Sequence, residues 1–261
     1  MCEHCGCAIT EPVGGRLHAG HLHETGSVES VEVLRDLLAE NDHLAAHNRE
    51  HFDAHGVLTI NLMSSPGAGK TALLERTIEA LGARLRIAVI EGDLATENDA
   101  ERIRAKGVPA VQITTGTACH LDAQMVHRAL DGLALAGLDV LFIENVGNLV
   151  CPASFDLGQH LDVTLLSVPE GDDKPQKYPV MFRAADLLLI TKSDLLPMLP
   201  EFDPRRAETS LRALASEAPV LSLSCRTRGG IDAWCAWLEQ ARAAHRAGVA
   251  AVQEHAHRLA L

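Results

Sequence analysis

Residues 57–71 read VLTINLMSSPGAGKT and decide the fold of this chain. The apolar run Val57–Met63 predicts a buried strand, and Lys70–Leu81, after the glycine-rich turn, has the apolar spacing of a helix. Strand, glycine-rich loop and helix in this order form the context in which the phosphate-binding loop GxxxxGK(S/T) occurs. Ser64 stands where the strict pattern has glycine. The stretch therefore predicts a P-loop nucleotide-binding fold.

The loop contains each chemical group that phosphate binding requires. Gly67 and Gly69 let backbone N–H groups crowd around the phosphates, Lys70 adds positive charge near the β- and γ-phosphates, and Thr71 offers a hydroxyl to Mg²⁺. The N-terminus of the following helix adds a partial positive charge. We expect these residues to bind the nucleotide: Ser65, Pro66, Gly67, Ala68, Gly69, Lys70, Thr71 and Ala72.

Beyond this loop, apolar strands alternate with helical segments. We expect strands at Arg86–Ile90, Ala110–Ile113, Val140–Ile143, Val163–Val168, Leu187–Ile190 and Val220–Leu223. Their lack of polar alternation is typical of parallel strands that are buried on both faces. Helices are expected between them, as at Leu121–Leu135, and in a closing segment at Ile231–Ala247. The fold class is α/β, with a mostly parallel β-sheet and helices on both faces.

The first 56 residues divide into two parts. Residues 1–26 are rich in Cys, His and Gly without clear periodicity and form a Cys/His tail that we expect to bind metal. Residues 27–56 have helical spacing of apolar residues, with Ser27 or Ser30 as the N-cap and Gly56 as the end. The nucleotide-binding domain is then residues 57–261.

Two predicted strand ends carry acidic groups that suit a nucleotide-bound metal. Glu144 follows the strand Val140–Ile143, and Gly147 comes three residues later, which suits Mg²⁺ binding and sensing of a γ-phosphate. Asp93 closes another strand and is a candidate for Mg²⁺ or the attacking water. The predicted catalytic residues are Lys70, Thr71, Asp93 and Glu144, of which the last three are the Mg²⁺ ligands.

The sequence TKSD at residues 191–194 is a candidate base-reading element. An Asp194 carboxylate can accept two hydrogen bonds from the N1–H and N2–H₂ edge of guanine, whereas adenine offers no such donor pair. Lys192 would lie along the base, and Thr191 stands where the common motif has Asn. Ser224 and Cys225 would form the loop behind the base. The element predicts GTP and GDP as ligands, with a preference over ATP of well over tenfold.

Composition excludes several classes of partner. The formal net charge of −12 argues against nucleic acid, and no apolar run reaches the ~18 residues of a spanning helix. The start MCEHCGC lacks the features of a signal peptide, so we expect a cytoplasmic protein. In a reducing compartment its seven cysteines should be thiols or metal ligands.

Two groups of cysteine and histidine are candidate metal sites for Ni²⁺ or Zn²⁺. Cys2, Cys5 and Cys7 lie within six residues of one another in the tail. The second group is Cys119, His120 and Cys151, and Cys151 follows Gly147 by four residues, which predicts coupling between nucleotide and metal. Three ligands leave a tetrahedral site incomplete, so a bridge across a two-fold interface would complete it. From these residues alone, small core cysteines are an equal alternative.

Histidines also repeat every four residues along the predicted N-terminal helix. These residues are His43, His47, His51 and His55, and adjacent members can share a metal ion. A solvated polar face is the simpler interpretation, and the pattern leaves the choice open.

Taken together, these segments resemble the nickel-incorporation GTPases of hydrogenase maturation, the HypB family of SIMIBI-class P-loop GTPases. The segments are MCEHCGC, NDHLAAHNREHF, NLMSSPGAGKTALLE, EGDLATENDAERI, TGTACHLDA, FIENVGNLVCPASFDLG, PEGDDKPQKYPVMF and TKSDLL. Ser64 and Glu144 match the family, whereas Thr191 departs from it.

The resemblance implies a homodimer that responds to GTP, with one metal site in the tail and another near the dimer interface. It also implies Ni²⁺ delivery to the large-subunit precursor of a nickel–iron hydrogenase, with the accessory protein HypA as partner. Because no arginine is placed as a catalytic finger, we expect slow intrinsic hydrolysis of GTP to GDP and phosphate. The alternative from another class is a nickel or zinc storage or buffering protein with a regulatory nucleotide site. A urease-maturation GTPase is less consistent with the tail and the helix at 27–56.

Overall fold

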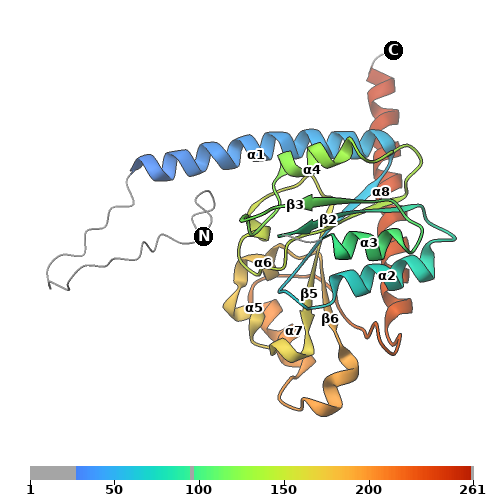
Figure 1. The fold of residues 1–261 in the computed structure, drawn as a ribbon. Helices are drawn as coiled ribbons and strands as arrows, with labels where there is room; N and C mark the ends of the chain where they lie inside the picture. Colours follow the sequence, from blue (N-terminus) through green and yellow to red (C-terminus); the bar gives the residue numbers. More distant parts are fainter. Residues whose placement is uncertain (1–27, 95–96, 260–261) are drawn as a thin grey trace, which may run out of the picture.

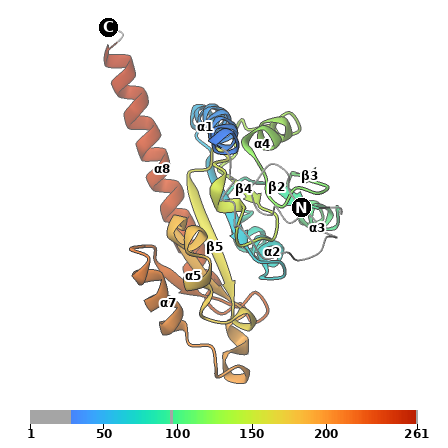
Figure 2. The same cartoon turned by 90° about the vertical axis from the view of Figure 1, so that its left-hand side faces the viewer.

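The computed structural model describes residues 28–94 and 97–259, with side chains for 37–94 and 97–251. The predictions for Cys2, Cys5, Cys7 and the N-cap Ser27 concern residues outside these ranges. The described chain forms one seven-stranded parallel sheet flanked by helices, in the order β3-β2-β4-β1-β5-β6-β7 (Figures 1 and 2). The predicted α/β fold class is confirmed.

The strands of the described sheet have three to seven residues. They are β1 Leu58–Ser64, β2 Ile87–Asp93, β3 Ala110–Thr114, β4 Val140–Glu144, β5 Leu161–Ser167, β6 Leu187–Thr191 and β7 Val220–Ser222. The α-helices are α1 Val28–His55, α2 Lys70–Leu81, α3 Asn98–Arg104, α4 Ala123–Leu130, α5 Lys174–Lys177, α6 Pro179–Ala184, α7 Pro204–Ala213 and α8 Ile231–Leu259. Short 3₁₀ helices are η1 Pro152–Ser154, η2 Val168–Glu170 and η3 Ser193–Met198.

Successive residues of a strand pack into hydrophobic cores on opposite faces of the sheet, because strand side chains alternate between the two faces. In β2, Ile87 and Val89 pack with α2, α3 and α8, whereas Ala88 and Ile90 pack with α1 and α4. On the second face, the half formed by β5 and β6 is covered instead by α6 and α7. Every strand of the sheet centre is therefore buried from both sides.

Several predicted bounds were wrong, including the end of the strand expected at Arg86–Ile90, which is β2 and continues to Asp93. The helix expected at Leu121–Leu135 is α4, Ala123–Leu130, because Asp122 accepts the Met125 N–H at 2.7 Å as an N-cap and the chain turns at Gly132. The strand expected at Val163–Val168 is β5, which begins at Leu161 and ends before the turn at Val168.

The closing helix expected to end at Ala247 continues to Leu259. Figure 2 shows this part of α8 extending past the body of the domain. Alanine-rich sequence continues the helix there without an apolar stripe for periodicity to detect. At the other end of the chain, α1 begins at Val28, so the rival N-cap Ser30 lies inside the helix. No helix in the described part of the chain is long and apolar enough to cross a membrane.

Candidate functional site

The phosphate loop lies at the carboxyl end of the central strand β1, between β4 and β5. The chain order reverses direction across the sheet at this point, which is where open α/β sheets bind ligands. Gly67 and Gly69 have φ values of 75° and 104°, in the left-handed region that favours glycine. The turn formed by these residues leads directly into the N-terminus of α2, and it suits an anion.

Three buried side chains from the loop and from β4 meet beneath it. The Thr71 hydroxyl donates to Glu144 Oε1 at 3.0 Å, and Lys70 Nζ lies 3.9 Å from the same oxygen. Lys70 Nζ also donates to the Ser64 hydroxyl at 3.2 Å. Glu144 Oε2 is buried without a hydrogen-bond partner among the described residues. A hydroxyl beside an incompletely bonded carboxylate is a ligand set that suits Mg²⁺, so these residues fit that ion.

Glu91 is an acidic member of this group that the sequence reasoning missed. The register of β2 with β4 places Glu91 opposite Glu144, and its side chain is 1 % exposed. Burial, followed by the Glu144 charge, raises the pKa of Glu91 to about 10. Burial raises the pKa of Glu144 as well, although Lys70 opposes that rise. The sequence feature that could have identified Glu91 as part of the site is an acidic residue inside an apolar strand.

Asp93 occupies the last position of β2, two residues beyond the Glu91–Glu144 pair. Its Oδ1 accepts the Leu94 N–H at 2.5 Å. Asp93 therefore lies at the same edge of the sheet as Glu144.

The loop after β4 is held against the phosphate loop and against Cys119. A Cβ on Gly147 would lie 2.8 Å from Pro66 Cα, so only glycine fits there. Asn148 donates its backbone N–H to Ser64 O at 2.8 Å and its side-chain amide to Cys119 O at 3.3 Å. Asn148, which the sequence reasoning also missed, thus links the nucleotide loop to a candidate metal ligand.

A cavity of about 430 Å³ opens beside the phosphate loop. The Asp194 carboxylate at its wall accepts the Ser224 hydroxyl at 2.6 Å, which fixes one of its two oxygens. Burial raises the pKa of the Cys225 thiol in the same wall to about 11, so it stays protonated near neutrality. The lining residues are Ala68, Gly69, Ala72, Glu75, Arg76, Thr191, Lys192, Asp194, Leu195, Cys225 and Arg226.

The base-side loop is tied directly to the phosphate loop. The Thr191 hydroxyl donates to Ala68 O at 2.7 Å, and Lys192 Nζ donates to Gly67 O, also at 2.7 Å. Lys192 has a φ of 57°, a left-handed conformation that is uncommon for a residue with a Cβ. The cavity wall and the anion-binding turn are therefore one connected unit.

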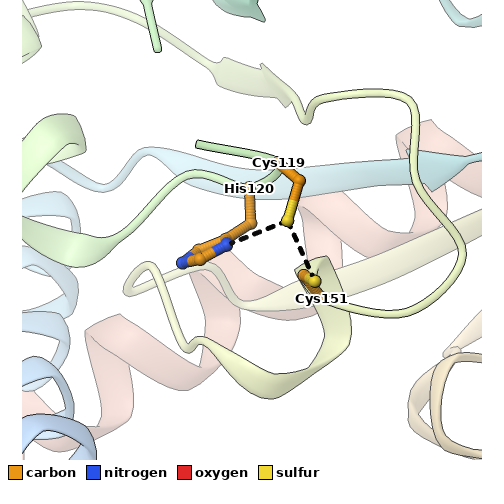
Figure 3. Close-up of side chains that lie close together, drawn as sticks. All are labelled: Cys119, His120 and Cys151. Atoms are coloured by element: carbon orange, nitrogen blue, oxygen red, sulfur yellow. Dashed lines mark hydrogen bonds between the residues drawn. The ribbon is translucent and has the colours of Figure 1, made fainter. Parts of the chain in front are cut away.

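Cys119, His120 and Cys151 come together although 31 residues separate the last two (Figure 3). The Cys119 thiol donates to the Cys151 sulfur at 3.0 Å, and the Cys119 sulfur lies 3.8 Å from His120 Nδ1. The ligand atoms of all three lie within 4.8 Å of one another. Two sulfurs and an imidazole suit a borderline divalent ion and leave one tetrahedral position for a further ligand.

The environment of His120 favours its neutral, ligating form. Its side chain is buried and stacks on Phe155, with ring centroids 3.9 Å apart and an interplanar angle of 17°. Burial lowers the pKa of His120, so the ring remains uncharged over a wider pH range. Metal binding requires this neutral form.

A family model, two curated proteins and two solved structures that resemble this chain all carry the name HypB. Residues 58–222 match the family model described as "CobW/HypB/UreG, nucleotide-binding domain". The chain is 50 % identical over 253 residues to the hydrogenase maturation factor HypB of Azotobacter vinelandii, which covers 94 % of this chain and 83 % of that protein. It is also 50 % identical over 236 residues to HypB of Escherichia coli K12, covering 88 % of this chain and 81 % of that protein.

A solved structure of HypB from Helicobacter pylori, described as a complex with nickel, is similar with a TM-score of 0.76. The two sequences are 42 % identical, and the match covers 79 % of this chain and 97 % of that one. HypB from Archaeoglobus fulgidus gives a TM-score of 0.73 at 39 % identity, covering 78 % of this chain and all of that one.

Proposed function

The chain belongs to the HypB family of hydrogenase maturation factors, and on this premise we propose that it hydrolyses GTP to time the transfer of Ni²⁺ to a hydrogenase precursor. The observation that carries the proposal is Asn148, which hydrogen-bonds both the end of the phosphate loop and the backbone of Cys119. A nucleotide-dependent shift of the loop after β4 would therefore move a ligand of the metal site.

Each part of the nucleotide has residues that suit it. The turn at Gly67 and Gly69 and the Lys70 ammonium would bind the phosphates, and Asp194 would accept the two donors of guanine. Thr71 and Glu144 would hold Mg²⁺, with Asp93 as a further candidate, and Mg²⁺ would neutralise charge on the β- and γ-phosphates. Arg76 lines the base-side cavity and donates its Nε–H to Cys225 O at 2.8 Å, so it is engaged away from the loop after β4. Slow intrinsic hydrolysis is consistent with this placement.

Ni²⁺ is the cargo in this proposal, and the Cys119–His120–Cys151 site would hold it during one part of the cycle. Zn²⁺ suits the same ligands. Because three protein ligands leave a position open, a second copy of the chain would complete the site in a dimer that forms with GTP. Cys2, Cys5 and Cys7 of the tail at 1–26 are the proposed second metal site, ahead of the helix 27–56 and the nucleotide-binding domain 57–261.

The proposed partners follow from the family. HypA would exchange metal with the protein, and the large-subunit precursor of the hydrogenase would receive it. We place this exchange in the cytoplasm. Two of the similar proteins, from Helicobacter hepaticus and Helicobacter pylori, carry the name hydrogenase/urease maturation factor, so the urease precursor is a second recipient to include in transfer assays.

Metal and nucleotide titrations test the proposal. Ni²⁺ affinity is measured with GDP and with a non-hydrolysable GTP analogue, and nucleotide affinity is measured for GTP and ATP. The proposal expects a nucleotide-dependent Ni²⁺ affinity that disappears in Cys119→Ala and Cys151→Ala, and a preference for GTP of well over tenfold. Metal binding that ignores the nucleotide would support the storage or buffering alternative, and equal affinity for GTP and ATP would refute the role of Asp194.

A further inference from the structure

Four histidines outside the nucleotide and cysteine sites gather where α1 lies against α4. His47, His51 and His55 are exposed at successive turns of α1, and His127 is exposed on α4. The two helices are in contact and lie side by side in Figures 1 and 2. Ring centroids are 5.3 Å apart for His47 and His127, and 4.8 Å apart for His51 and His55. We refer to these four side chains as the imidazole cluster.

The hydrogen bonds of buried Asn48 determine which nitrogen of His127 is available. The Asn48 amide nitrogen donates to Ala123 O at 2.9 Å and to Leu157 O at 3.2 Å, so the amide oxygen must be the atom that faces His127. An amide oxygen only accepts, and therefore the His127 Nδ1, 3.0 Å away, carries the proton. The Nε2 of His127 then has its lone pair available to a ligand. A ring nitrogen that donates to a buried acceptor in this way is the usual support for a metal-binding histidine.

His55 has the same arrangement. Its Nδ1 lies 2.9 Å from the backbone oxygen of His51, which only accepts, so the His55 Nε2 is also the unprotonated nitrogen of the neutral ring. In the neutral tautomers that these hydrogen bonds select, His127 and His55 both present an unprotonated Nε2, which is the form that binds metal.

The spacing of the rings also suits a shared ion. A metal–imidazole bond of about 2.0–2.1 Å places each ring centroid about 3.2 Å from the ion, so two rings on a tetrahedral or square ion are about 4.5–5.2 Å apart. The His47–His127 centroid separation of 5.3 Å agrees with this range to within a small rotation of an exposed ring. The edge-on interplanar angle of 71° between these two rings avoids stacking of one ligand on the other.

Another histidine group in the described chain is tighter but has the opposite hydrogen bonding. Asp53, His160 and His245 have ligand atoms within 4.8 Å of one another. However, His160 Nδ1 accepts the Thr59 N–H at 2.9 Å, so its proton lies on Nε2 and is donated to Asp53 at 3.0 Å. The nitrogen that faces the group is thus protonated, and a metal ion would have to displace that proton.

We propose that the imidazole cluster is a separate surface site for one borderline divalent ion, bound by His47 and His127. The site uses imidazole alone and does not depend on the nucleotide loop or on Cys119, His120 and Cys151. Its exposure permits rapid loading and release. The proposed site shares no ligand with the cysteine site.

The experiment uses Ni²⁺ as the probe on the full chain, with two readouts. Equilibrium dialysis counts the total bound Ni²⁺, and thiolate-to-Ni²⁺ charge-transfer absorption reports only the cysteine sites. The variants are His47→Gln and His127→Gln, and the matched control is His43→Gln, an exposed histidine on the same helix one turn before His47. Far-UV circular dichroism and the thermal midpoint check that each variant is folded.

The proposal expects both cluster variants to lose about one Ni²⁺ per chain while the thiolate absorption stays unchanged, and it expects no loss in His43→Gln. Undiminished Ni²⁺ binding by folded His47→Gln would overturn it, as would a loss that falls equally on the thiolate absorption. If His127→Gln is unstable, His47→Gln alone decides, because no hydrogen bond of the His47 ring supports the fold in the described structure. A failure of the nucleotide-dependent function appears in the thiolate absorption, and therefore the two failures are distinguishable.

Discussion

Replacing Asn148 by alanine should weaken the effect of the nucleotide on Ni²⁺ affinity while leaving both ligands able to bind. The side chain makes the bond from its amide to Cys119 O at 3.3 Å and accepts the Val150 N–H at 2.9 Å. The backbone bond from Asn148 N–H to Ser64 O remains in the variant. The perturbation therefore removes the contact to the metal ligand and keeps the contact to the phosphate loop.

The magnitude follows from the bond that is lost. A partly buried neutral hydrogen bond contributes about 1 kcal/mol, and of the two bonds of the Asn148 side chain only the one to Cys119 reaches the cysteine site. If that bond forms in one nucleotide state and not in the other, its loss changes the ratio of Ni²⁺ affinities by about fivefold. A coupling free energy of 1–3 kcal/mol, about 5- to 150-fold in affinity, is typical of allosteric proteins. Loss of about 1 kcal/mol should therefore abolish a weak effect of the nucleotide on Ni²⁺ affinity and reduce a strong one.

The assay is Ni²⁺ competition against a chromophoric chelator, carried out with GDP and with a non-hydrolysable GTP analogue. Asn41→Ala is the matched control, because the Asn41 side chain also makes two hydrogen bonds to residues distant in the sequence. It donates to Asp156 O at 2.8 Å and accepts the Ala123 N–H at 2.9 Å. These bonds link α1 to the neighbouring segments and do not touch the phosphate loop. An affinity ratio in Asn148→Ala equal to that of the wild type, or an equal fall in Asn41→Ala, would refute the reasoning.

Three further predictions concern the base, the core and pH. Asp194→Asn should weaken GTP binding by about 10- to 100-fold, because the amide N–H group of the new side chain would face an N–H donor of guanine in place of one charge-assisted hydrogen bond. Calorimetry with GTP and ATP measures the two affinities. Thr77→Val should cost about 1–3 kcal/mol in urea unfolding, since the buried Trp234 indole N–H loses its acceptor at 2.8 Å, whereas Thr77→Ser should retain most of that stability. Burial raises the pKa of Asp162 to about 6, above its unfolded value. The protonated carboxyl therefore adds to the free energy of unfolding at low pH, and this contribution is lost as pH rises through about 6. Asp162→Asn should therefore gain stability relative to the wild type as pH rises from 3.8 to about 6, with a constant difference above that, and a pH-independent difference in unfolding free energy across this range would contradict this.

Local patterns predicted most of the fold. The strands and α2 were recognisable because their periodicity depends on neighbours in sequence, and the phosphate loop is a contiguous motif. The bounds of α4 and α8 were less accurate because the start of α4 depends on a single capping residue and the end of α8 depends on helix propensity. The tail cysteines remain a prediction.

The P-loop fold, the candidate base-reading acid Asp194 and the resemblance to the family all follow from contiguous motifs in the chain. Which distant groups meet depends on how the folded chain packs. The pairing of Glu91 with Glu144 depends on the register of β2 and β4, and the link from Asn148 to Cys119 depends on how two loops pack. The available nitrogen of His127 depends on buried Asn48, 79 residues earlier. Spacing along the chain carries no information about such contacts, because they form between segments whose relative position is set by the sheet and by the packing of its helices.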